Sequence, residues 1–198
     1  VRGKIKDFEK TFLEFKKKAK FVKEKKRLSF IYFREFVEDA RDIKDEKVDL
    51  RARITNKKAE LIIKYGDWGG SDLREEISLP IELENFEEAI YFLNCLGWNK
   101  GIINTTETFI FDYEGIEFAL VKNKNFNYFE AEKMVKDKKD INKINRKILE
   151  SCKKFDLNPF TEDEFMEQIN NLNNIKENQF DFSKQDFFTL KEKFEEYF

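Results

Sequence analysis

The chain has 198 residues and a net charge of −2, with 40% hydrophobic and 39% charged residues. Its 23 Phe residues supply enough apolar surface for a core, which excludes disorder over the whole chain. Histidine is absent, so a Ser-His-Asp triad, a Cys-His dyad and a His-ligated zinc site within this chain are excluded. Any catalysis must use carboxylates, Lys, Arg, Tyr or a metal held by oxygen atoms.

Charge is unevenly distributed, because residues 1–27 are rich in Lys and Arg and residues 156–198 are acidic. A basic segment can bind nucleic acid, but we interpret this one as a solvated face and expect no nucleic-acid partner. Cys95 and Cys152 are expected to be free thiols, which favours a reducing, cytoplasmic compartment. The sequence has no signal-peptide pattern and no apolar run of about 18 residues, so no membrane association is expected.

Eight strands are predicted from alternating polarity or from enrichment in β-branched and aromatic residues. They cover residues 1–5, 28–33, 49–54, 59–65, 73–80, 103–113, 116–122 and 126–134. Helical periodicity is expected over residues 7–18 and 85–96, and again after residues 140, 161 and 183. Consecutive antiparallel strands with flanking helices predict an α+β fold, in which the sheet is strongly curved or closed into a barrel.

Several connections carry turn or cap signals. Residues 55–58 suit a hairpin turn, and Glu114-Gly115 suits a second one. Gly97 is placed to end the helix before it, and Thr161 with Glu164 forms a capping box at the start of another. Residues 66–71 are either a lid or a long hairpin loop.

Two adjacent predicted strands place charged side chains on alternate residues. Arg51 and Arg53 share one face of their strand, and Glu60 and Lys64 share one face of the next. Such a charged face either meets water or lines a cavity that binds a highly charged ligand with a metal.

The chain resembles the CYTH family, which has the triphosphate tunnel fold of class IV adenylate cyclases and of thiamine or inorganic triphosphatases. The matching segments occur in the family's order within residues 1–135. They are Asp49-Leu-Arg51-Ala-Arg53-Ile, Ile63-Lys64-Tyr65-Gly66, Arg74-Glu-Glu76, Leu96-Gly97-Trp98, Glu117-Phe-Ala-Leu120 and Phe129-Glu130-Ala-Glu132. The resemblance implies a tunnel domain over residues 1–137 and a helical extension over residues 138–198.

The resemblance also implies a phosphate-binding group and a metal-binding group. The phosphate-binding residues are expected to be Arg2, Lys4, Arg51, Arg53, Lys64 and Arg74. The expected ligands for Mg²⁺ or Mn²⁺ are Glu76, Glu130 and Glu132. The implied ligand is a nucleoside triphosphate or polyphosphate. The implied reaction is hydrolysis by water, or cyclisation of ATP to cyclic AMP by its own ribose hydroxyl.

Two departures from the family pattern leave a second reading open. The family's first strand carries Glu-x-Glu-x-Lys, and residues 1–5 are similar only to its end, with Arg2 in the Lys position. Residues 104–108 lack the usual basic side chains, and residues 119–122 lack an acidic one. The alternative is a degenerate module that binds polyanions or docks on a protein partner through its C-terminal helices. Glu130 and Glu132 could likewise be salt-bridge partners of Arg51 and Arg53 in a structural network without metal.

Overall fold

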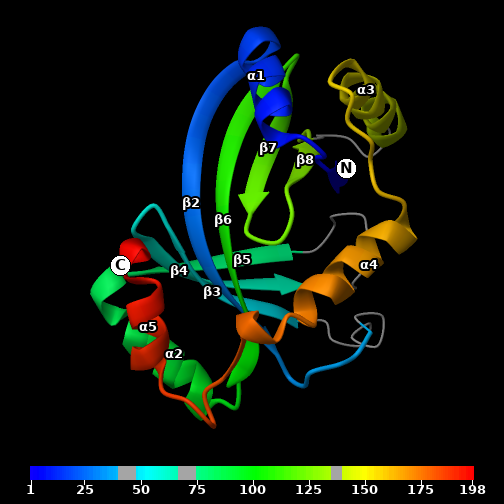
Figure 1. Cartoon of the computed structure of the whole chain (residues 1–198). Helices are drawn as coiled ribbons and strands as arrows, with labels where there is room; N and C mark the ends of the chain where they lie inside the picture. The colour runs from blue at the N-terminus through cyan, green and yellow to red at the C-terminus, as the bar shows by residue number, and fades with distance from the viewer. Residues whose placement is uncertain (40–47, 67–74, 135–139) are drawn as a thin grey trace. The chain divides into compact units, whose positions relative to one another are not determined.

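The computed structural model describes residues 1–39, 48–66, 75–134 and 140–198 (Figure 1). Arg74 and most of the predicted lid or loop over residues 66–71 lie outside the described residues. By their contacts, the described residues form two compact units. Unit 1 comprises residues 1–25 and 106–165, and unit 2 comprises residues 26–105 and 166–198. These units do not test the predicted boundary after residue 137, which stays a prediction.

The strands and helices follow each other in the order predicted from the sequence, with β9 as an additional strand. Several elements are longer or shorter than predicted by a few residues. The strands are β1 (Arg2–Lys4), β2 (Lys20–Phe33), β3 (Val48–Thr55), β4 (Lys58–Tyr65), β5 (Glu75–Ile81), β6 (Lys100–Tyr113), β7 (Ile116–Asn123), β8 (Tyr128–Glu132) and β9 (Gln179–Asp181). The helices are α1 (Phe8–Lys18), α2 (Phe86–Cys95), α3 (Ile141–Lys154), α4 (Glu162–Asn173) and α5 (Phe187–Lys193).

The described strands form one sheet in the order β1-β8-β7-β6-β2-β3-β4-β5, and β9 pairs with β6. Every pairing with a defined register is antiparallel, which confirms the predicted α+β fold with an antiparallel sheet. In the residues that the structure describes, β1 and β5 are the end strands and the sheet is not closed. The closed tunnel therefore stays a prediction.

Some element boundaries differ from those expected, because a local sequence pattern does not show which strands pair in the sheet. β2 begins at Lys20, eight positions before the predicted start. Its register with β3 covers Arg27 to Ile31, and its other neighbour in the sheet is β6, so pairing between strands extends a stretch whose own pattern is polar. β9 was not predicted at all. α5 begins at Phe187 rather than near Ser183, because Asp186 is its N-cap and accepts a hydrogen bond from the Thr189 N–H at 2.8 Å.

The predicted turn signals are confirmed where the structure describes them. Asn56 and Lys57 have φ of 48° and 63°, as a two-residue type I′ hairpin requires. Gly97 has φ of 81° and donates to the Asn94 carbonyl oxygen at 2.9 Å, while the Trp98 N–H donates to the Leu93 carbonyl oxygen at 3.0 Å. These two bonds form a Schellman motif, which ends α2 at the position where only glycine adopts the left-handed conformation easily.

Unit 1 has a core that is dominated by aromatic rings. Phe15 on α1 is fully buried and stacks on Phe155 with ring centroids 3.8 Å apart. Phe111 on β6 and Phe118 on β7 contact Phe15 at 5.4 and 5.1 Å. The buried Ile148 and Cys152 place α3 on the same cluster. Burial raises the pKa of the Cys152 thiol to about 11, so this free cysteine is an inert part of the core.

Unit 2 has its own core on one face of β2, β3 and β4. α2 contributes Phe86 and Ile90, and α5 contributes Phe187 and Leu190. The Phe86 and Phe187 rings lie 6.2 Å apart, and Figure 1 shows the two helices side by side. This packing fixes which face of β3 and β4 is apolar, and so leaves the opposite face to the charged residues.

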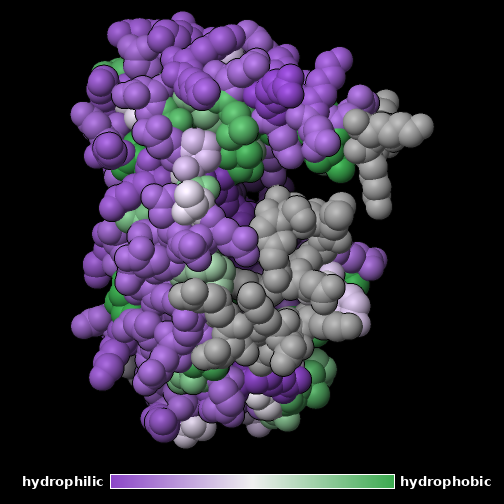
Figure 2. All heavy atoms as spheres, turned by 90° about the vertical axis from the view of Figure 1, so that its right-hand side faces the viewer, coloured by the Kyte–Doolittle hydropathy of each residue, from purple (hydrophilic) through white to green (hydrophobic). Residues whose placement is uncertain are grey.

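The surface reflects the high content of charged residues. The face shown in Figure 2 is largely hydrophilic, with hydrophobic side chains in small separate groups. α3, the longest described helix, has 14 residues, and none of the described helices has an apolar stretch that could span a membrane.

Replacing Phe15 tests the aromatic core of unit 1. We expect Phe15→Ala to lower the free energy of unfolding by about 3–5 kcal/mol, because the cavity would form at a fully buried ring. The measurement is urea unfolding followed by circular dichroism. Phe188→Ala on α5, where the side chain is 62% exposed, is the matched control and should change stability by about 0.5 kcal/mol or less. Equal effects of the two substitutions would contradict this description of the core.

Candidate functional site

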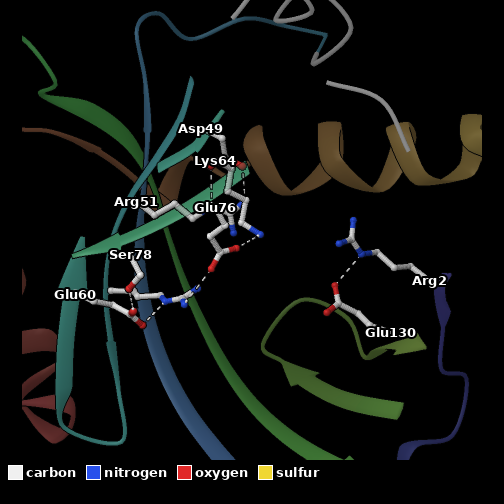
Figure 3. Close-up of polar contacts among 9 residues, drawn as sticks. Arg2, Asp49, Arg51, Glu60, Lys64, Glu76, Ser78 and Glu130 are labelled. Atoms are coloured by element: carbon white, nitrogen blue, oxygen red, sulfur yellow. Dashed lines mark hydrogen bonds and ion pairs between the residues drawn. The ribbon is translucent and has the colours of Figure 1, made fainter. Parts of the chain in front are cut away.

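The charged face predicted from the sequence is formed by three neighbouring strands of unit 2. The register pairs Arg53 with Glu60, and it aligns Asp49, Lys64 and Glu76 in one row across β3, β4 and β5. Side chains that are directly opposite or two positions apart in a strand share one face of the sheet. We call Asp49, Arg51, Arg53, Glu60, Lys64 and Glu76 the strand-face cluster (Figure 3).

Arg51 is held by a carboxylate on its own strand. Its Nε and Nη2 atoms donate to the Asp49 Oδ1 and Oδ2 atoms, both at 2.7 Å. Asp49 is only 7% exposed, so this bidentate pair is largely removed from water. A paired, buried carboxylate of this kind fixes the guanidinium in one orientation.

Arg53 is shared between two carboxylates from different strands. Its Nε donates to the Glu60 Oε1 at 2.6 Å, and its Nη2 lies 3.7 Å from the Glu76 Oε1. Glu76 also pairs with Lys64, whose Nζ lies 2.9 Å from its Oε2. The Ser78 hydroxyl donates to the second oxygen of Glu60. The contacts run from β3 to β5 in a continuous network, which Figure 3 shows.

Two observations separate this face from an ordinary water-exposed face of a sheet. Ile62, which lies between Glu60 and Lys64 on the same face, is fully buried. The Arg53 side chain is only 14% exposed. Charged groups in such a partly buried place interact more strongly than at an open surface, because water screens them less.

The ionisation of the two glutamates follows from these contacts. Burial alone would raise the pKa of Glu60, but hydrogen bonds from Arg53 and Ser78 and the charge of Arg53 outweigh it and lower that pKa. Burial is likewise outweighed at Glu76, where the hydrogen bond and charge of Lys64 and the nearby arginines lower the pKa. Both carboxylates are therefore ionised at neutral pH.

Arg2 and Glu130, which were predicted to bind phosphate and metal respectively, form a separate group in unit 1. They are register partners on β1 and β8, and the Arg2 Nε donates to the Glu130 Oε1 at 2.8 Å (Figure 3). The Arg2 guanidinium also lies over the Phe165 ring, with its central carbon 5.5 Å from the ring centroid. Lys4 lies two residues along β1 on the same face, and its register partner is Tyr128.

The structure thus assigns the predicted site residues to two groups, one in each unit. Arg51, Arg53, Lys64 and Glu76 come together in unit 2, whereas Arg2 and Glu130 pair in unit 1. Glu132 is exposed at the end of β8 and has other contacts. Arg51 and Arg53 form ion pairs with Asp49, Glu60 and Glu76, whereas Glu130, which was expected as their partner in the alternative, pairs with Arg2.

Sequence reasoning missed Asp49 as part of the site, although the signal was available. Asp49 precedes Arg51 by two residues, so the same alternation that grouped the arginines also places Asp49 on their face. Ser78 follows Glu76 in the same way on β5. Phe165 could not have been grouped with Arg2, because the contact joins residues far apart in sequence.

The carboxylates of the strand-face cluster suit a hard divalent cation. No group of three or more Cys, Asp or Glu residues stands ready to hold a metal in the described ranges. Mg²⁺, however, is usually held by one or two carboxylates together with substrate phosphates. Glu60 and Glu76 both contact Arg53, so two such carboxylates lie close together on this face. The donor set fits Mg²⁺ or Mn²⁺ when a phosphate supplies the remaining oxygen atoms.

Comparison with solved structures identifies proteins that share this fold. The PH1819 protein from Pyrococcus horikoshii OT3 is 19% identical with a TM-score of 0.66, over 85% of this chain and 95% of that protein. A candidate adenylate cyclase from Vibrio parahaemolyticus is 12% identical with a TM-score of 0.60, over 84% and 95% of the two chains. HpAC1 from Hippeastrum, a candidate adenylyl cyclase described as having a dominant triphosphatase activity, is 11% identical with a TM-score of 0.54, over 85% and 94%.

At these identities the likeness concerns the fold alone, and it agrees with the antiparallel α+β fold that the family resemblance implied, while the closed tunnel stays a prediction. No protein-family profile matches the sequence, and no curated protein matches it.

The lowered pKa values of Glu60 and Glu76 predict how stability depends on pH. A carboxyl group with a lowered pKa stabilises the fold above its unfolded value, which is 4.5 here, and that contribution is lost as the pH falls through the lower folded value. We expect wild-type protein to lose more stability than Glu60→Gln with Glu76→Gln when the pH is lowered from about 6 to about 3. Urea unfolding at several pH values measures this.

Glu88→Gln on the exposed side of α2 is the control for that experiment, and it should keep the wild-type pH dependence. If the double variant also kept the wild-type dependence, the two glutamates would not be ion-paired in solution.

Proposed function

We propose that this protein binds a triphosphate or a longer polyphosphate through the strand-face cluster, together with Mg²⁺ or Mn²⁺. The observation that carries this proposal is the convergence of Arg51, Arg53 and Lys64 on one partly buried face of β3 and β4. The shared fold with a candidate adenylate cyclase and with a protein described as a triphosphatase supports it.

The two arginines suit phosphate by their chemistry. A guanidinium group is always charged and offers parallel N–H donors that match two oxygen atoms of one phosphate. Lys64 adds a compact charge that can follow a phosphate as it moves. Because Asp49 and Glu60 hold the arginines through Nε, each guanidinium is already oriented before a ligand binds.

The same carboxylates set the condition under which a polyanion can bind. The phosphate oxygens must share or replace the bonds that Arg53 and Lys64 make to Glu60 and Glu76, and bringing another anion beside these glutamates costs free energy. A divalent cation on Glu60 and Glu76 would remove that cost and neutralise phosphate charge. Binding of tripolyphosphate and of Mg²⁺ should therefore be mutually reinforcing.

Two reactions fit such a site. Water attacks the bound triphosphate in a triphosphatase, whereas the ribose hydroxyl attacks the α-phosphorus of ATP in an adenylate cyclase. In both, the residues of the cluster position the phosphates and stabilise the negative charge that develops on them.

A binding module without catalysis is the second candidate. It is favoured by the full pairing of Arg51, Arg53 and Lys64 with carboxylates, together with the uncharged segment Asn104–Thr106 on β6. Such a protein would bind polyphosphate with little turnover.

Exchanging the Asp49–Arg51 ion pair for an amide pair tests the binding site without changing net charge. When the tripolyphosphate concentration is about 100 times its Kd, ligand binding should stabilise the wild-type protein by about 2.7 kcal/mol. This raises Tm by roughly 5–10 °C for a chain of this length. In Asp49→Asn with Arg51→Gln we expect most of this shift to disappear, because a neutral amide cannot replace the guanidinium. Thermal unfolding with tripolyphosphate and Mg²⁺, followed by circular dichroism, measures it.

The matched control removes the exposed ion pair between Glu14 and Lys18 on α1, as Glu14→Gln with Lys18→Gln. It should keep the full tripolyphosphate shift. A shift that survives in the Asp49 and Arg51 variant, or disappears in the control, would remove the strand-face cluster as the binding site.

Product analysis distinguishes the two reactions from simple binding. The protein is incubated with Mg²⁺ or Mn²⁺ and either tripolyphosphate or ATP, and phosphate, pyrophosphate and cyclic AMP are quantified. A triphosphatase releases phosphate from tripolyphosphate, and a cyclase releases pyrophosphate and cyclic AMP from ATP in equal amounts. Binding without any of these products would favour the second candidate.

A further inference from the structure

The helix α2 is apolar on both of its sides. On the inner side, Phe86, Ile90 and Leu93 are buried in the core of unit 2. On the opposite side, Tyr91 is 69% exposed and Phe92 is 60% exposed. Hydrophobic residues all round a helix are typical of one that is covered on both sides. The exposed side of α2 therefore has the composition of an interface.

The exposed residues of α2 and of its C-cap form one continuous stripe. They are spaced three or four positions apart, which puts them side by side on the surface of a helix. We call Glu88, Tyr91, Phe92, Cys95 and Leu96 the outer face of α2. Phe92 lies near the middle of this face, and Glu88 and Leu96 lie at its two ends.

The apolar part of the outer face is large enough for a pair of copies. At their exposed fractions, Tyr91, Phe92 and Leu96 leave roughly 350 Å² of apolar surface uncovered in each chain. Two copies bring together roughly 700 Å², which is the apolar part of an interface of about 1,200 Å² in total. Such an interface is at the lower end of the standard size, so its ionic contacts matter.

The two ends of the outer face carry opposite charges. Glu88 lies in the first turn of α2. Arg34 lies beyond the last turn, where its guanidinium carbon is 3.6 Å from the centroid of the Trp98 ring, and a Cβ atom on Gly97 would lie 3.9 Å from its Nη1. In the described part of the chain, neither Arg34 nor Glu88 forms an ion pair. Each end thus presents a charge that can pair with another molecule.

We propose that the outer face of α2 is the interface of a symmetric homodimer, in which α2 of one copy packs antiparallel against α2 of the second copy. Two-fold symmetry lets the same patch serve both copies. With Phe92 near the axis, Glu88 of each copy faces the C-terminal end of the other helix and pairs with Arg34 of the other copy. These positions of anion and cation also suit the two helix dipoles.

A second copy is the favoured occupant because the face is complementary to itself. Its apolar centre meets an identical apolar centre, and each charged end meets the opposite charge. The interface uses residues of unit 2 and does not involve the strand-face cluster. It therefore does not depend on the binding of a polyphosphate.

Sedimentation equilibrium of the full chain at micromolar concentrations tests the dimer. We expect a reversible dimer in the wild type. Phe92→Glu should raise the dissociation constant by roughly 100-fold or more, because both copies lose a central ring and a charge is buried without a partner. Leu13→Glu is the matched control, since Leu13 is a 54% exposed apolar residue on α1, and it should keep the wild-type dimer.

Exchanging the charges tests the antiparallel arrangement. Glu88→Arg and Arg34→Glu should each weaken the dimer by roughly 10-fold or more, because like charges then meet at both ends. An equimolar mixture of these two variants should associate more strongly than either alone, because opposite charges meet at both ends of the mixed dimer. In dilute solution, where the single chain unfolds, Glu88 forms no ion pair within the described part of the chain, so Glu88→Gln keeps the pH dependence of stability.

A wild-type chain that stays monomeric at all these concentrations would overturn the dimer and leave the face to a partner of different chemistry. A dimer that persists in Phe92→Glu, or is lost in Leu13→Glu, would overturn the position of the interface. A mixture that associates no better than its components would overturn the antiparallel pairing. Circular dichroism checks the fold of each variant, and the mixing experiment decides if Phe92→Glu does not fold.

Discussion

The pairing of cations with carboxylates across β3, β4 and β5 is the interaction on which the candidate site depends. The antiparallel register brings Arg53 opposite Glu60 and Lys64 opposite Glu76, and one face of three strands becomes a continuous ionic network. The network holds guanidinium groups in fixed orientations in a partly buried place, where unpaired charges would be costly. It is possible only because the other face of β3 and β4 packs on α2 and the core of unit 2.

The strand-face cluster has three cations and three carboxylates, so its formal charges cancel while its side chains are held in fixed orientations. A polyanion gains from arginines that are already oriented, but it must approach the carboxylates that orient them. The lowered pKa values of Glu60 and Glu76 express the same balance, since each proton that binds there releases a cation from its partner. Affinity for phosphate, dependence on a divalent cation and stability toward acid are therefore linked properties of one network.

Residues 158–165 lead into α4 and also contact β1. This segment donates a hydrogen bond to β1, approaches Gly3 closely and places an aromatic ring on Arg2. α3 is anchored in the core of unit 1 by Ile148 and Cys152, so the segment that follows it starts from a fixed point. These contacts fix both the main chain and the side chain of Arg2 on a strand that has only three residues of its own.

The sequence by itself determined that Arg51 and Arg53 share one face of β3 and that Glu60 and Lys64 share one face of β4, because this follows from alternation along single strands. It also determined the hairpin at Asn56, the helix end at Gly97 and the capping box at Thr161, each of which depends on a few neighbouring residues. Only the tertiary structure decided which carboxylate pairs with which cation, since this depends on the register between strands. It also decided the early start of β2 at Lys20, the presence of β9 and the contact of Phe165 with Arg2. These features arise from hydrogen bonds and ring contacts between segments far apart in the chain, which no local pattern encodes.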